Sequence, residues 1–599
     1  MKELEYPFDC EELIKKKKTY RKQLLADGTT RIRKKIAILG GQTTQNIKLI
    51  LELFLLNYGI EPEFYESEYN KYYEDGMFDN PELEAFAPDV IYVCTCVRNI
   101  TDFPAMSDSK DTIASLKKAL TDRFEGLWQS LKERYHCAII QNNFEYPFFR
   151  LMGNKDATDP HGRVRFVNSL NDHFADYAAE HENFYICDVN YISACYGLDR
   201  WSDPYYWHMY KYGVAVPAIP LLSFNVANII KSMFGHNKKV LNLDLDNTLW
   251  GGIVGDDGAD NIEIGQETPM AQVYSEFQEY VKLHEQLGVV LTVNSKNDEE
   301  NARSGFKRPD SVLKESDFVS FKANWDPKSH NLSATAAELS LLPESFVFVD
   351  DNPAERAIIE SSFAGTAVPE MTEPEHYINV LDKSGFFEVT GLSTDDLKRN
   401  EMYAENAKRQ ALQASFTDYG EYLKSLDMKA EIQNFVPLYM SRIAQLTNKS
   451  NQFNLTTRRY SQADIGAMAA DPAYLTLYGK LADKFGDNGV VSVVIGKIDK
   501  ANKDLHIDLW LMSCRVLKRD MEFAMMDELV KRCQALGICR IIGYYYPTAK
   551  NGMVKNFFEL QGFTKTSEDE EGNTVWEFTI PADYHRKQSV IEVNGEQGE

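Results

Sequence analysis

Long hydrophobic runs, paired cysteines and an excess of positive charge are all missing from this chain of 599 residues. Its formal charge is -25 and its isoelectric point is about 5.0, whereas a general binder of nucleic acid needs positive charge to meet the phosphate backbone. No run of about 20 apolar residues is present to span a bilayer. The start of the sequence has no apolar stretch of the signal-peptide kind. We therefore expect neither nucleic acid nor a membrane as a partner.

The nine cysteines are odd in number and scattered along the chain. Cys94 and Cys96 form a C-x-C pattern, but no second pair stands at the spacing of a zinc site. This usage predicts a reduced, cytoplasmic protein rather than a disulfide framework.

The length is too great for one core and suggests three or four domains. From Lys35 onward, apolar strand-like runs alternate with helical patterns, which predicts an α/β fold with parallel sheets covered on both faces. We expect a helical lead-in over 1–34, an α/β domain over 35–235, a second over 236–390, a helical connector over 391–430, a third α/β domain over 431–580 and a tail over 581–599.

Within 236–390, the apolar runs "KVLNLDL", "VVLTVNS" and "FVFVDD" each end on polar residues. Because the carboxyl ends of parallel strands line the ligand crevice of an open α/β sheet, these polar ends are expected to converge. The first run raises the sharpest question, since Asp244 and Asp246 are two carboxylates placed two positions apart.

A four-part pattern in this domain resembles the haloacid dehalogenase (HAD) phosphatase superfamily. Its parts occur in order over about 107 positions: the D-x-D-x-T stretch, Ser295, Lys328 in "NWDPKSHNL", and the pair Asp350-Asp351. The resemblance implies a capless Rossmann-like parallel sheet. The residues from Gly251 to Gly265 leave room for a small flap hairpin but for no cap domain, so we expect either a bulky substrate or closure by neighbouring domains.

The resemblance also implies roles for these residues. Asp244 attacks phosphorus and forms an aspartyl-phosphate, and Asp246 protonates the leaving oxygen and later activates water. Ser295 hydrogen-bonds the phosphoryl group, and Lys328 supplies fixed positive charge. Thr248, in the D-x-D-x-T stretch, is expected to bind the substrate. The expected metal ligands are Asp244, Asp350 as a direct ligand and the backbone carbonyl of Asp246. Asp351 is expected to bind the metal through water or to orient the other ligands. Crowded carboxylates with oxygen ligands only suit Mg²⁺.

Longer stretches resemble the FkbH-like branch of that superfamily, HAD subfamily IIIC. They are "LDLDNTLWGGIVGDDG", "SKND", "FKANWDPKSHNL", "FVFVDDNPAER" and "RIAQLTNKSNQFNLTTRRY", and the resemblance covers roughly residues 35–580. It implies transfer of a glyceryl unit from a phosphorylated three-carbon acid, 1,3-bisphosphoglycerate, onto the thiol of an acyl carrier protein. A cysteine would take the acyl group, and the HAD site would remove the remaining phosphate.

The third domain resembles the GNAT acyltransferase fold and carries "LMSCRVLKRDME". Cys514 is the candidate acyl-carrying thiol, with a buried strand cysteine as the alternative. Arg515 and Arg519 are candidates for binding a phosphate or the acidic surface of a carrier. Polar contacts to a hydroxylated acyl group are expected from the preceding loop, namely Asn448, Asn451, Gln452 and Asn454, unless these side chains only satisfy loop backbone.

The same segment departs from the family pattern, because Lys518 and Asp520 stand where glycines are usual. Coenzyme A binders need small residues there for the backbone to approach pyrophosphate. A carboxylate at Asp520 would be a good helix cap but would repel phosphate. Acetyl-coenzyme A is therefore not an expected ligand.

The first domain resembles the SGNH-hydrolase fold without its nucleophile. In "ILGGQTT", Gln42 occupies the serine position, with Thr43 as a weak substitute. Asn142 and His208 correspond to the family's Asn and His, although a histidine among aromatic residues is more often structural. This domain is expected to bind or position a partner.

Three functions remain open from the sequence. The first is a Mg²⁺-dependent phosphatase coupled to acyl transfer onto a carrier protein. The second is a stand-alone HAD phosphatase acting on a sugar or polyol phosphate, with a degenerate acyltransferase domain, which Lys518 and Asp520 favour. The third is a non-catalytic scaffold that merely holds a metal, and the complete set of acids with Lys328 argues against it.

Overall fold

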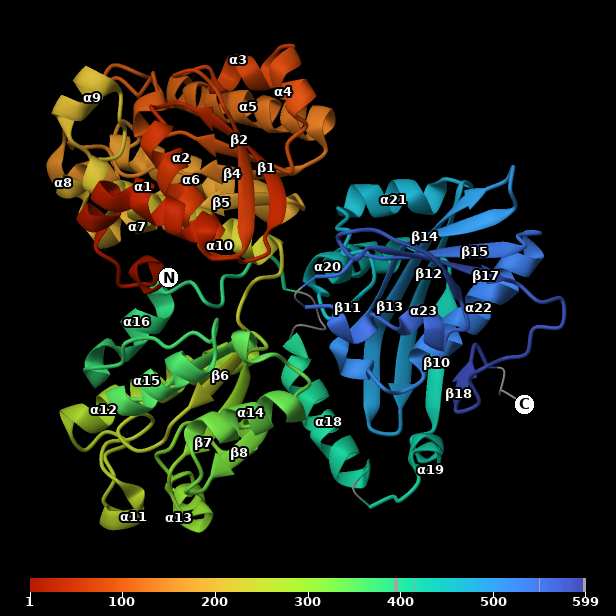
Figure 1. The fold of residues 1–599 in the computed structure, drawn as a ribbon. Coiled ribbons are helices and arrows are strands. Elements are labelled where there is room, and N and C mark those ends of the chain that lie inside the picture. Colours follow the sequence, from red (N-terminus) through yellow and green to blue (C-terminus); the bar gives the residue numbers. More distant parts are fainter. Residues whose placement is uncertain (393–396, 414, 549, 596–599) are drawn as a thin grey trace. The chain divides into compact units, whose positions relative to one another are not determined.

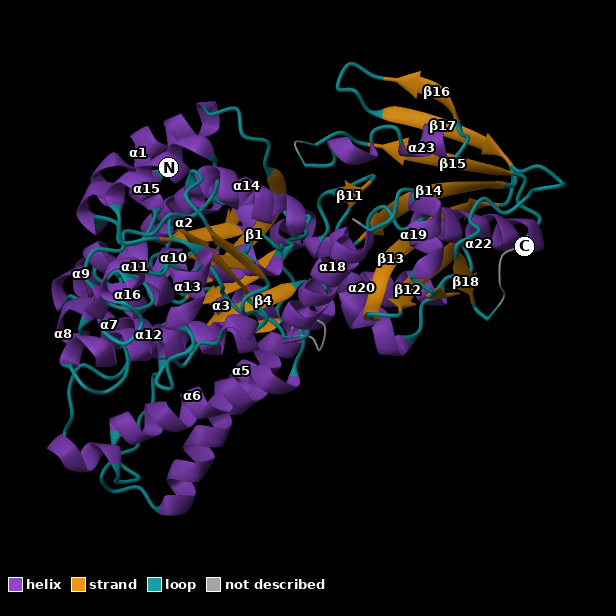
Figure 2. Ribbon diagram, turned by 90° about the horizontal axis from the view of Figure 1, so that it is seen from below, coloured by secondary structure: helices purple, strands orange, loops and turns teal. Residues whose placement is uncertain are grey.

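The computed structural model describes residues 1–392, 397–413, 415–548 and 550–595, and the chain divides into two compact units, Met1–Met233 and Phe234–Glu599 (Figure 1). Positions 393–396 and 414 of the expected connector and 596–599 of the expected tail lie outside the described residues. The fold is mixed α/β with parallel sheets, as the sequence predicts. Figure 2 shows helices and strands in both units.

The first unit holds a five-stranded, wholly parallel sheet in the order β2-β1-β3-β4-β5. The strands are β1 (Ile32–Gly40), β2 (Ile60–Glu66), β3 (Val90–Cys94), β4 (Ala138–Asn142) and β5 (Phe184–Cys187). The larger helices are α1 (Cys10–Ala26), α2 (Gln45–Asn57), α5 (Lys110–Tyr135), α6 (Arg163–Glu180) and α10 (Ile219–Met233). Short helices complete the unit: α3 (Tyr72–Met77), α4 (Pro81–Phe86), α7 (Val189–Tyr196), α8 (Leu198–Trp201) and α9 (Pro204–Tyr210).

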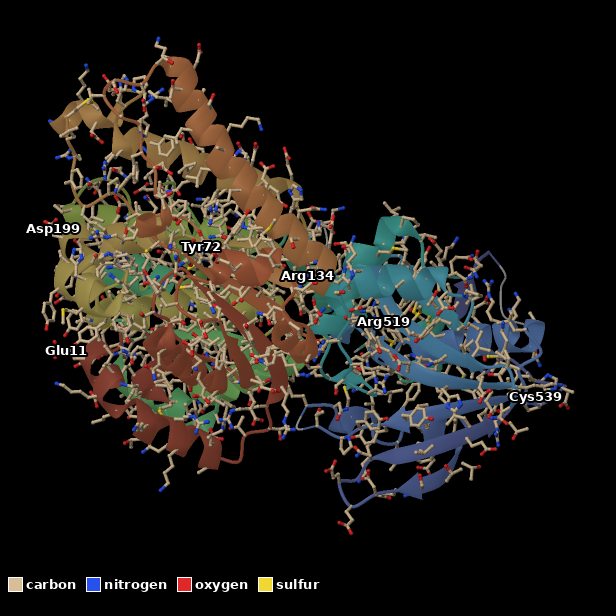
Figure 3. All side chains as sticks on the ribbon, turned by 90° about the horizontal axis from the view of Figure 1, so that it is seen from above. Glu11, Tyr72, Arg134, Asp199, Arg519 and Cys539 are labelled. Atoms are coloured by element: carbon tan, nitrogen blue, oxygen red, sulfur yellow. The ribbon has the colours of Figure 1, made fainter. Side chains whose placement is uncertain are left out.

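Alternating side chains of the sheet explain how its faces are covered. Ala37 and Leu39 of β1 share a core cluster with Trp128 of α5 and Leu170 of α6, so these two helices cover one face. Tyr72, labelled in Figure 3, is buried in the same cluster. On the other side, α1, α2 and α10 pack against one another. The expected helical lead-in is thus part of the first unit.

Within the described part of the chain, one helix, Val216–Met233, is long and apolar enough to cross a membrane, and 72% of it is buried inside the protein. A buried core helix passes the same test of length and composition.

The second unit begins with a four-stranded parallel sheet in the order β8-β7-β6-β9. The strands are β6 (Val240–Leu243), β7 (Val290–Ser295), β8 (Ser320–Ala323) and β9 (Phe346–Val349). They correspond to the apolar runs of the sequence and confirm the expected parallel sheet. The accompanying helices are α11 (Val254–Asp257), α12 (Pro269–Gln286), α13 (Glu299–Gly305), α14 (Lys328–Glu338), α15 (Pro353–Ser362) and α16 (Tyr377–Lys383).

The expected flap hairpin over 251–265 is wrong in its detail. A single antiparallel bridge joins Gly251 to Glu263, and the short helix α11 lies between them. The buried residue Val254 donates its backbone N–H to Asp246 Oδ1 at 3.0 Å, so the loop is held against the strand ends. A projecting hairpin would break this contact.

The remainder of the second unit is built on a mostly antiparallel sheet in the order β16-β17-β15-β14-β13-β12-β10-β18, with β11 paired to β14. Its strands are β10 (Met428–Gln433), β11 (Phe453–Asn454), β12 (Tyr474–Asp483), β13 (Gly486–Asp499), β14 (Asp504–Met512), β15 (Arg540–Tyr545), β16 (Thr564–Glu568), β17 (Thr574–Thr579) and β18 (Ile591–Val593). Its helices are α18 (Arg399–Gln413), α19 (Tyr419–Ser425), α20 (Met440–Lys449), α21 (Gln462–Ala470), α22 (Met521–Ala535) and α23 (Phe557–Leu560).

Strands β14 and β15 separate after a short paired stretch. Strand β14 pairs in parallel with β15 only from Asp504 to His506. Further along β14, the two-residue strand β11 pairs with Leu511 and Met512 instead. The loop before β11 is thereby brought beside the residues that follow Met512.

Candidate active site

Three parallel strands end side by side at the candidate site. Asp244 directly follows β6, Ser295 is the last residue of β7, and Asp350 directly follows β9. The backbone N–H of Asp244 donates to Val349 O at 2.9 Å, which extends the ladder by one step. The sheet therefore brings Asp244 and Asp350 together at its carboxyl edge, as the sequence predicts.

Asp244, Asp350 and Asp351 form a tight cluster of carboxylates. Each offers one oxygen, and these oxygens all lie within 4.8 Å of one another. Asp350 is fully buried and Asp244 is 7% exposed. Burial, and then the negative charge of Asp244, raise the pKa of Asp350 to about 6. The same two causes raise the pKa of Asp351. Such a cluster favours either protonation or a bound cation.

Lys328 lies between two of these acids. Its Nζ is 2.9 Å from Asp244 Oδ2 and 2.6 Å from Asp350 Oδ2, and the side chain is 3% exposed. Burial acts to lower the pKa of Lys328, but Asp244 and Asp350 outweigh it and raise that pKa to about 12. As the first residue of α14, Lys328 is further fixed by its carbonyl, which accepts from Asn294 Nδ2 at 2.9 Å. Lys328 is thus a permanent positive charge at this edge.

Asp246 takes a different direction from Asp244. Its carboxylate accepts hydrogen bonds from Trp250 Nε1 at 2.9 Å, Val254 N at 3.0 Å and Asn297 Nδ2 at 3.0 Å. Its side chain is not a member of the cluster of three acids found among the described residues. Burial raises its pKa, which suits an acid that must hold a proton before giving it away. A role for Asp246 in metal binding stays a prediction that concerns its backbone carbonyl.

The donor set fits Mg²⁺. All three clustered ligands are carboxylate oxygens, the chemistry that this hard cation prefers. The Thr248 hydroxyl is fully buried and has no hydrogen-bond partner among the described residues, so a polar group of a ligand would satisfy it. Ser295 is also buried at the end of β7. The arrangement of these acids can therefore hold a divalent cation.

Several supporting residues escape the sequence analysis. Arg356 Nη1 donates to the carbonyls of Asp350 and Asp351 at 2.8 and 2.7 Å, which fixes the turn after β9. Asn352 N donates to Asp350 Oδ1 at 2.9 Å and so orients that carboxylate. Asn297 holds Asp246. The quoted stretches "SKND" and "FVFVDDNPAER" contain all three residues, but no spacing rule marks them as supports.

Four of the candidate residues in the C-terminal part line one cavity of about 130 Å³, namely Asn451, Gln452, Cys514 and Arg515. Cys514 lies in a short 3-10 turn after β14 and is partly exposed, which contradicts the alternative of a buried strand cysteine. Asn454 does not line the cavity. It is fully buried, and its amide contacts Ser450 O and Thr457 N, so the loop-backbone alternative describes it. Asn448 likewise donates to Ala444 O and Tyr460 O.

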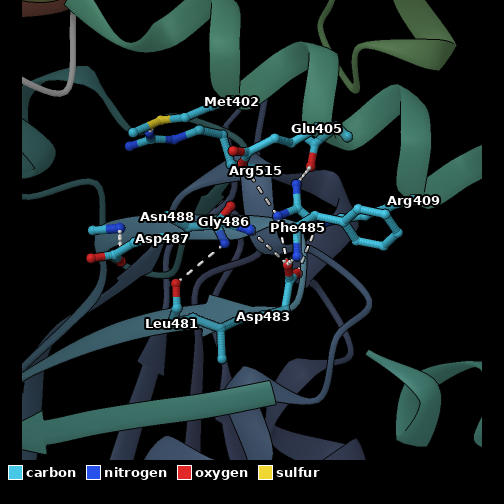
Figure 4. A network of polar contacts seen from close by, with 12 residues as sticks. Met402, Glu405, Arg409, Leu481, Asp483, Phe485, Gly486, Asp487, Asn488 and Arg515 are labelled. Atoms are coloured by element: carbon cyan, nitrogen blue, oxygen red, sulfur yellow. Dashed lines mark hydrogen bonds and ion pairs between the residues drawn. The ribbon is translucent and has the colours of Figure 1, made fainter. Parts of the chain in front are cut away.

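The expectation that Arg519 binds a phosphate or a carrier is wrong. Arg519 is buried, with Nη1 3.2 Å from Asp483 Oδ2 and Nη2 donating to Asn406 Oδ1 at 2.6 Å. Asp483 also receives a two-pronged ion pair from Arg409, as Figure 4 shows. Burial and the charge of Arg409 lower the pKa of Arg519 to about 10. The positive charge of Arg519 therefore pairs with Asp483 inside the protein.

The two departures from the glycine pattern keep a glycine-like backbone. Lys518 and Asp520 both have φ of 61°, in the left-handed region that glycine adopts at no cost. Asp520 does occupy the N-cap position of α22, but its carboxylate makes no capping hydrogen bond within the described chain, so its expected role as a cap is wrong. The left-handed backbone explains this, because N-cap residues that use their side chains normally have extended backbones.

In the first unit, two of the expected SGNH positions meet at Cys94, because Gln42 Nε2 and Asn142 Nδ2 both donate to its Sγ, at 3.5 and 3.9 Å. Gln42 is buried, and its Oε1 accepts from Gly213 N at 2.8 Å. Thr43 donates its hydroxyl to Tyr210 O at 2.6 Å. Asn142 is buried at the end of β4, whereas His208 is exposed on α9. The side chains of Gln42, Thr43 and Asn142 therefore make hydrogen bonds within the first unit.

Comparison with known proteins finds matches for the first unit and for the part of the chain that holds the acid cluster. The sequence profile of the family described as "FkbH, N-terminal domain" matches residues 35–231. The N-terminal part of the protein BF1531 from Bacteroides fragilis, whose crystal structure contains a phosphatase domain complexed with Mg, is 29% identical. The match covers 63% of this chain and 99% of that one, with a TM-score of 0.59. No curated protein matches the chain.

Acetyltransferase structures also match, over about a quarter of the chain. The ribosomal-protein-S18-alanine N-acetyltransferase from Escherichia coli is 10% identical over 26% of this chain and 99% of its own, with a TM-score of 0.20. A GNAT-family acetyltransferase from Streptococcus pneumoniae is 14% identical over 26% of this chain and 100% of its own, with a TM-score of 0.22. Scores this low support no conclusion about activity.

Proposed function

We propose that this chain is a Mg²⁺-dependent phosphatase of the HAD type, coupled to transfer of a glyceryl group onto an acyl carrier protein. The observation that carries the proposal is the charge arrangement at the carboxyl edge of the sheet. Asp244, Asp350 and Asp351 crowd within 4.8 Å, and Lys328 pairs with two of them. The similarity to a structure with a phosphatase domain complexed with Mg supports the same interpretation.

The phosphatase step uses residues whose positions are described above. Mg²⁺, held by Asp244, Asp350 and Asp351, would neutralise the phosphoryl oxygens and the crowded acids. The Asp244 carboxylate forms a bond to phosphorus while the bond to the leaving oxygen breaks, and Asp246 gives that oxygen its proton. Asp246 then takes a proton from the water that hydrolyses the aspartyl-phosphate, which restores both residues. Lys328 holds the carboxylates in place and offsets the developing negative charge.

The acyl step would take place at Cys514. Its sulfur forms a bond to the acyl carbon of an acyl phosphate, the bond from carbon to the phosphate oxygen breaks, and the thiol proton passes to the released phosphate through solvent. The thiol of the carrier's prosthetic arm then attacks the thioester, so that the acyl group moves to the carrier and Cys514 is again a thiol. The phosphate ester left on the acyl group becomes the substrate of Asp244.

A short loop over 251–265 in place of a cap domain suits this sequence of steps, because a carrier protein is a bulky partner. All nine cysteines are free. A mechanism that needs Cys514 as a thiol requires a reducing compartment, so we propose the cytoplasm.

The proposal can be tested by mass. The full-length protein is incubated with 1,3-bisphosphoglycerate, Mg²⁺ and a phosphopantetheinylated carrier, and both proteins are then weighed intact. A glyceryl adduct on the carrier is expected. With Asp244→Asn, the carrier adduct should keep its phosphate and be heavier by one phosphoryl group. With Cys514→Ala, no adduct should form.

Matched variants separate these roles from general damage. Asp256→Asn replaces an exposed acid on α11, and Cys539→Ala replaces an exposed thiol, and both should behave as the unchanged protein. Phosphate release without any adduct would support a stand-alone phosphatase of sugar or polyol phosphates instead. Neither phosphate release nor an adduct would support a non-catalytic scaffold.

A further inference from the structure

The cavity beside Cys514 lies at the amino edge of the phosphatase sheet. One side of the cavity is lined by Lys239, which directly precedes β6, and by four residues of the segment before β9, namely Leu341, Leu342, Glu344 and Ser345. Helices α18 and α20, the loop before β11 and the turn at Cys514 line the other side. The pairing of β11 with Leu511 and Met512 brings that loop to the thiol.

The lining of the cavity is strongly basic in a protein of net charge -25. Six cationic side chains contribute to it: Lys239, Arg399, Arg442, Lys449, Arg515 and Lys550. Among the described lining residues, Glu344 is the one carboxylate, and it pairs with Lys550. So many like charges around a cavity in an acidic protein indicate that an anion enters it.

The pKa of Lys239 reflects the positive charge around it. Burial is the largest cause that lowers its pKa, and the charges of Arg399, Lys550 and Arg515 lower it further, while Cys514 acts in the opposite direction. These groups belong to α18, the loop after β15 and the turn after β14. A compact anion between them would relieve the repulsion, just as a cation relieves the crowded acids at the other edge of the sheet.

Cys514 lines this cavity and packs against the apolar cluster that contains Tyr403. Tyr403 is 3% exposed. One side of the thiol is therefore covered by α18, and the other lines the cavity. A ligand held by the cationic wall would lie against the sulfur.

The strand β6 separates this cavity from the metal site. Lys239 stands before the strand and Asp244 after it, with four residues between them. At a rise of about 3.3 Å per residue, the two positions are roughly 16 Å apart. One small phosphate cannot contact both, so an anion in the cavity occupies a second site.

We propose that the cavity lined by Lys239, Arg515 and Lys550 is a binding site for a small phosphorylated acid, distinct from the metal site and open to the thiol of Cys514. The identification of that acid as an acyl phosphate rests on the proposed function. The binding of a phosphate group rests only on the geometry and charge of the cavity.

Alkylation of Cys514 measures this binding without any enzymatic turnover. The full-length protein is treated with iodoacetamide in EDTA at rising concentrations of inorganic phosphate, at constant ionic strength, and each cysteine is followed by peptide mass spectrometry. Phosphate should slow alkylation of Cys514 at least fivefold in a saturable manner. Cys195 and Cys539, both exposed, serve as internal controls and should react at constant rates.

Variants assign the effect to the cavity. Protection should be lost in Lys239→Met and weakened in Lys550→Met, a partly exposed position that tolerates substitution if Lys239→Met does not fold. Lys497→Met, at an exposed position of β13, should keep full protection. So should Asp244→Asn, which shows that the metal site is not responsible.

Two results would overturn the proposal. One is that phosphate does not protect Cys514 in the unchanged protein, and the other is that Lys239→Met and Lys550→Met are both protected as strongly as the unchanged protein. If Cys514 is protected but never carries an acyl group in the mass assay, the anion site stands and the acyl-transfer function fails. The two proposals are thereby tested separately.

Discussion

Lys328 shows how the role of a single residue depends on the charges around it. A buried lysine alone would lose its proton readily, but two carboxylates within 3 Å keep Lys328 charged. In turn, Lys328 makes it possible for Asp244 and Asp350 to stay close together before a metal binds. The three side chains therefore act as one electrostatic unit.

The substitution Lys328→Met removes the positive charge from this unit. We expect phosphatase activity to fall by about 100- to 1000-fold, since a preorganised charge at the reacting group is lost. We also expect the metal-free protein to lose roughly 3–5 kcal/mol of unfolding free energy, because two buried carboxylates are left unpaired. Urea unfolding in EDTA and in Mg²⁺ measures the second effect, which Mg²⁺ should partly reverse.

Lys307→Met, at an exposed position in the same part of the chain, serves as the control and should change neither quantity. If Lys328→Met were as stable as the unchanged protein in EDTA, the carboxylates would not depend on this lysine.

Glu145, a buried acid in the first unit, makes the stability of that unit depend on pH. Burial raises its pKa to about 7, while the backbone N–H of Val97 contacts its carboxylate at 3.2 Å. The folded state therefore holds a proton on Glu145 that the unfolded state releases above pH 4.5. Stability from this group is complete below that value and is lost as the pH rises through about 7.

Replacement by glutamine removes this titration. In Glu145→Gln, the first unit should become more stable relative to the unchanged protein as the pH rises from 5 to 8, by up to about 3 kcal/mol. Hydrogen exchange of the amides of β3 and β4 at both pH values reports on this unit. The exposed Glu180→Gln should show no such dependence, and a parallel response of the two variants would exclude Glu145 as the titrating group.

At the scale of elements, the position of α18 decides which residues meet at the cavity. Arg409 near its end makes hydrogen bonds of 2.7 Å to both oxygens of Asp483, at the end of β12, and neither side chain is more than 2% exposed. Figure 4 shows this contact beside Glu405 and the turn at Phe485 and Gly486. Arg399 and Tyr403, on the same helix, line the cavity.

Arg409→Met should therefore destabilise the second unit and loosen α18. Because Arg519 still faces Asp483 at 3.2 Å, we expect a loss at the lower end of the range for a broken buried pair, about 3 kcal/mol. Urea unfolding measures the loss, and faster hydrogen exchange should appear in α18. Lys408→Met, at the neighbouring exposed position, should leave both unchanged. Slow exchange of α18 in both variants would show that other contacts hold the helix.

At the scale of the whole molecule, the two compact units should respond differently to Mg²⁺. All three clustered acids belong to the second unit. At a concentration 100 times the dissociation constant, a bound ion stabilises its unit by about 2.7 kcal/mol. We expect Mg²⁺ to slow hydrogen exchange in the strands β6, β7 and β9 and to leave the five-stranded sheet of the first unit unaffected.

Asp350→Asn should abolish this response, since it removes a carboxylate from the centre of the cluster. Asp326→Asn replaces an exposed acid of the same part of the chain and should preserve it. Equal protection of both units by Mg²⁺ would point to a metal site elsewhere.

The sequence alone determined the parallel sheets and the site at their carboxyl edge. Runs such as "VLNLDLD" carry both the apolar strand and the acid that ends it, so the pattern of a few neighbouring residues is enough to place Asp244, Ser295 and Asp350 at strand ends. The order of these parts along the chain then predicted the kind of chemistry. Such features are local, and local patterns are what a sequence states directly.

Only the tertiary structure decided which charges are used internally and which face a cavity. Arg515 and Arg519 are four positions apart and equivalent as sequence signals, yet Arg519 is committed to Asp483 whereas Arg515 lines the cavity. Lys239 carries no motif at all, and its place beside Cys514 joins positions 275 apart. The energy of a charge depends on burial and on neighbours brought together by folding, and no local pattern contains either of them.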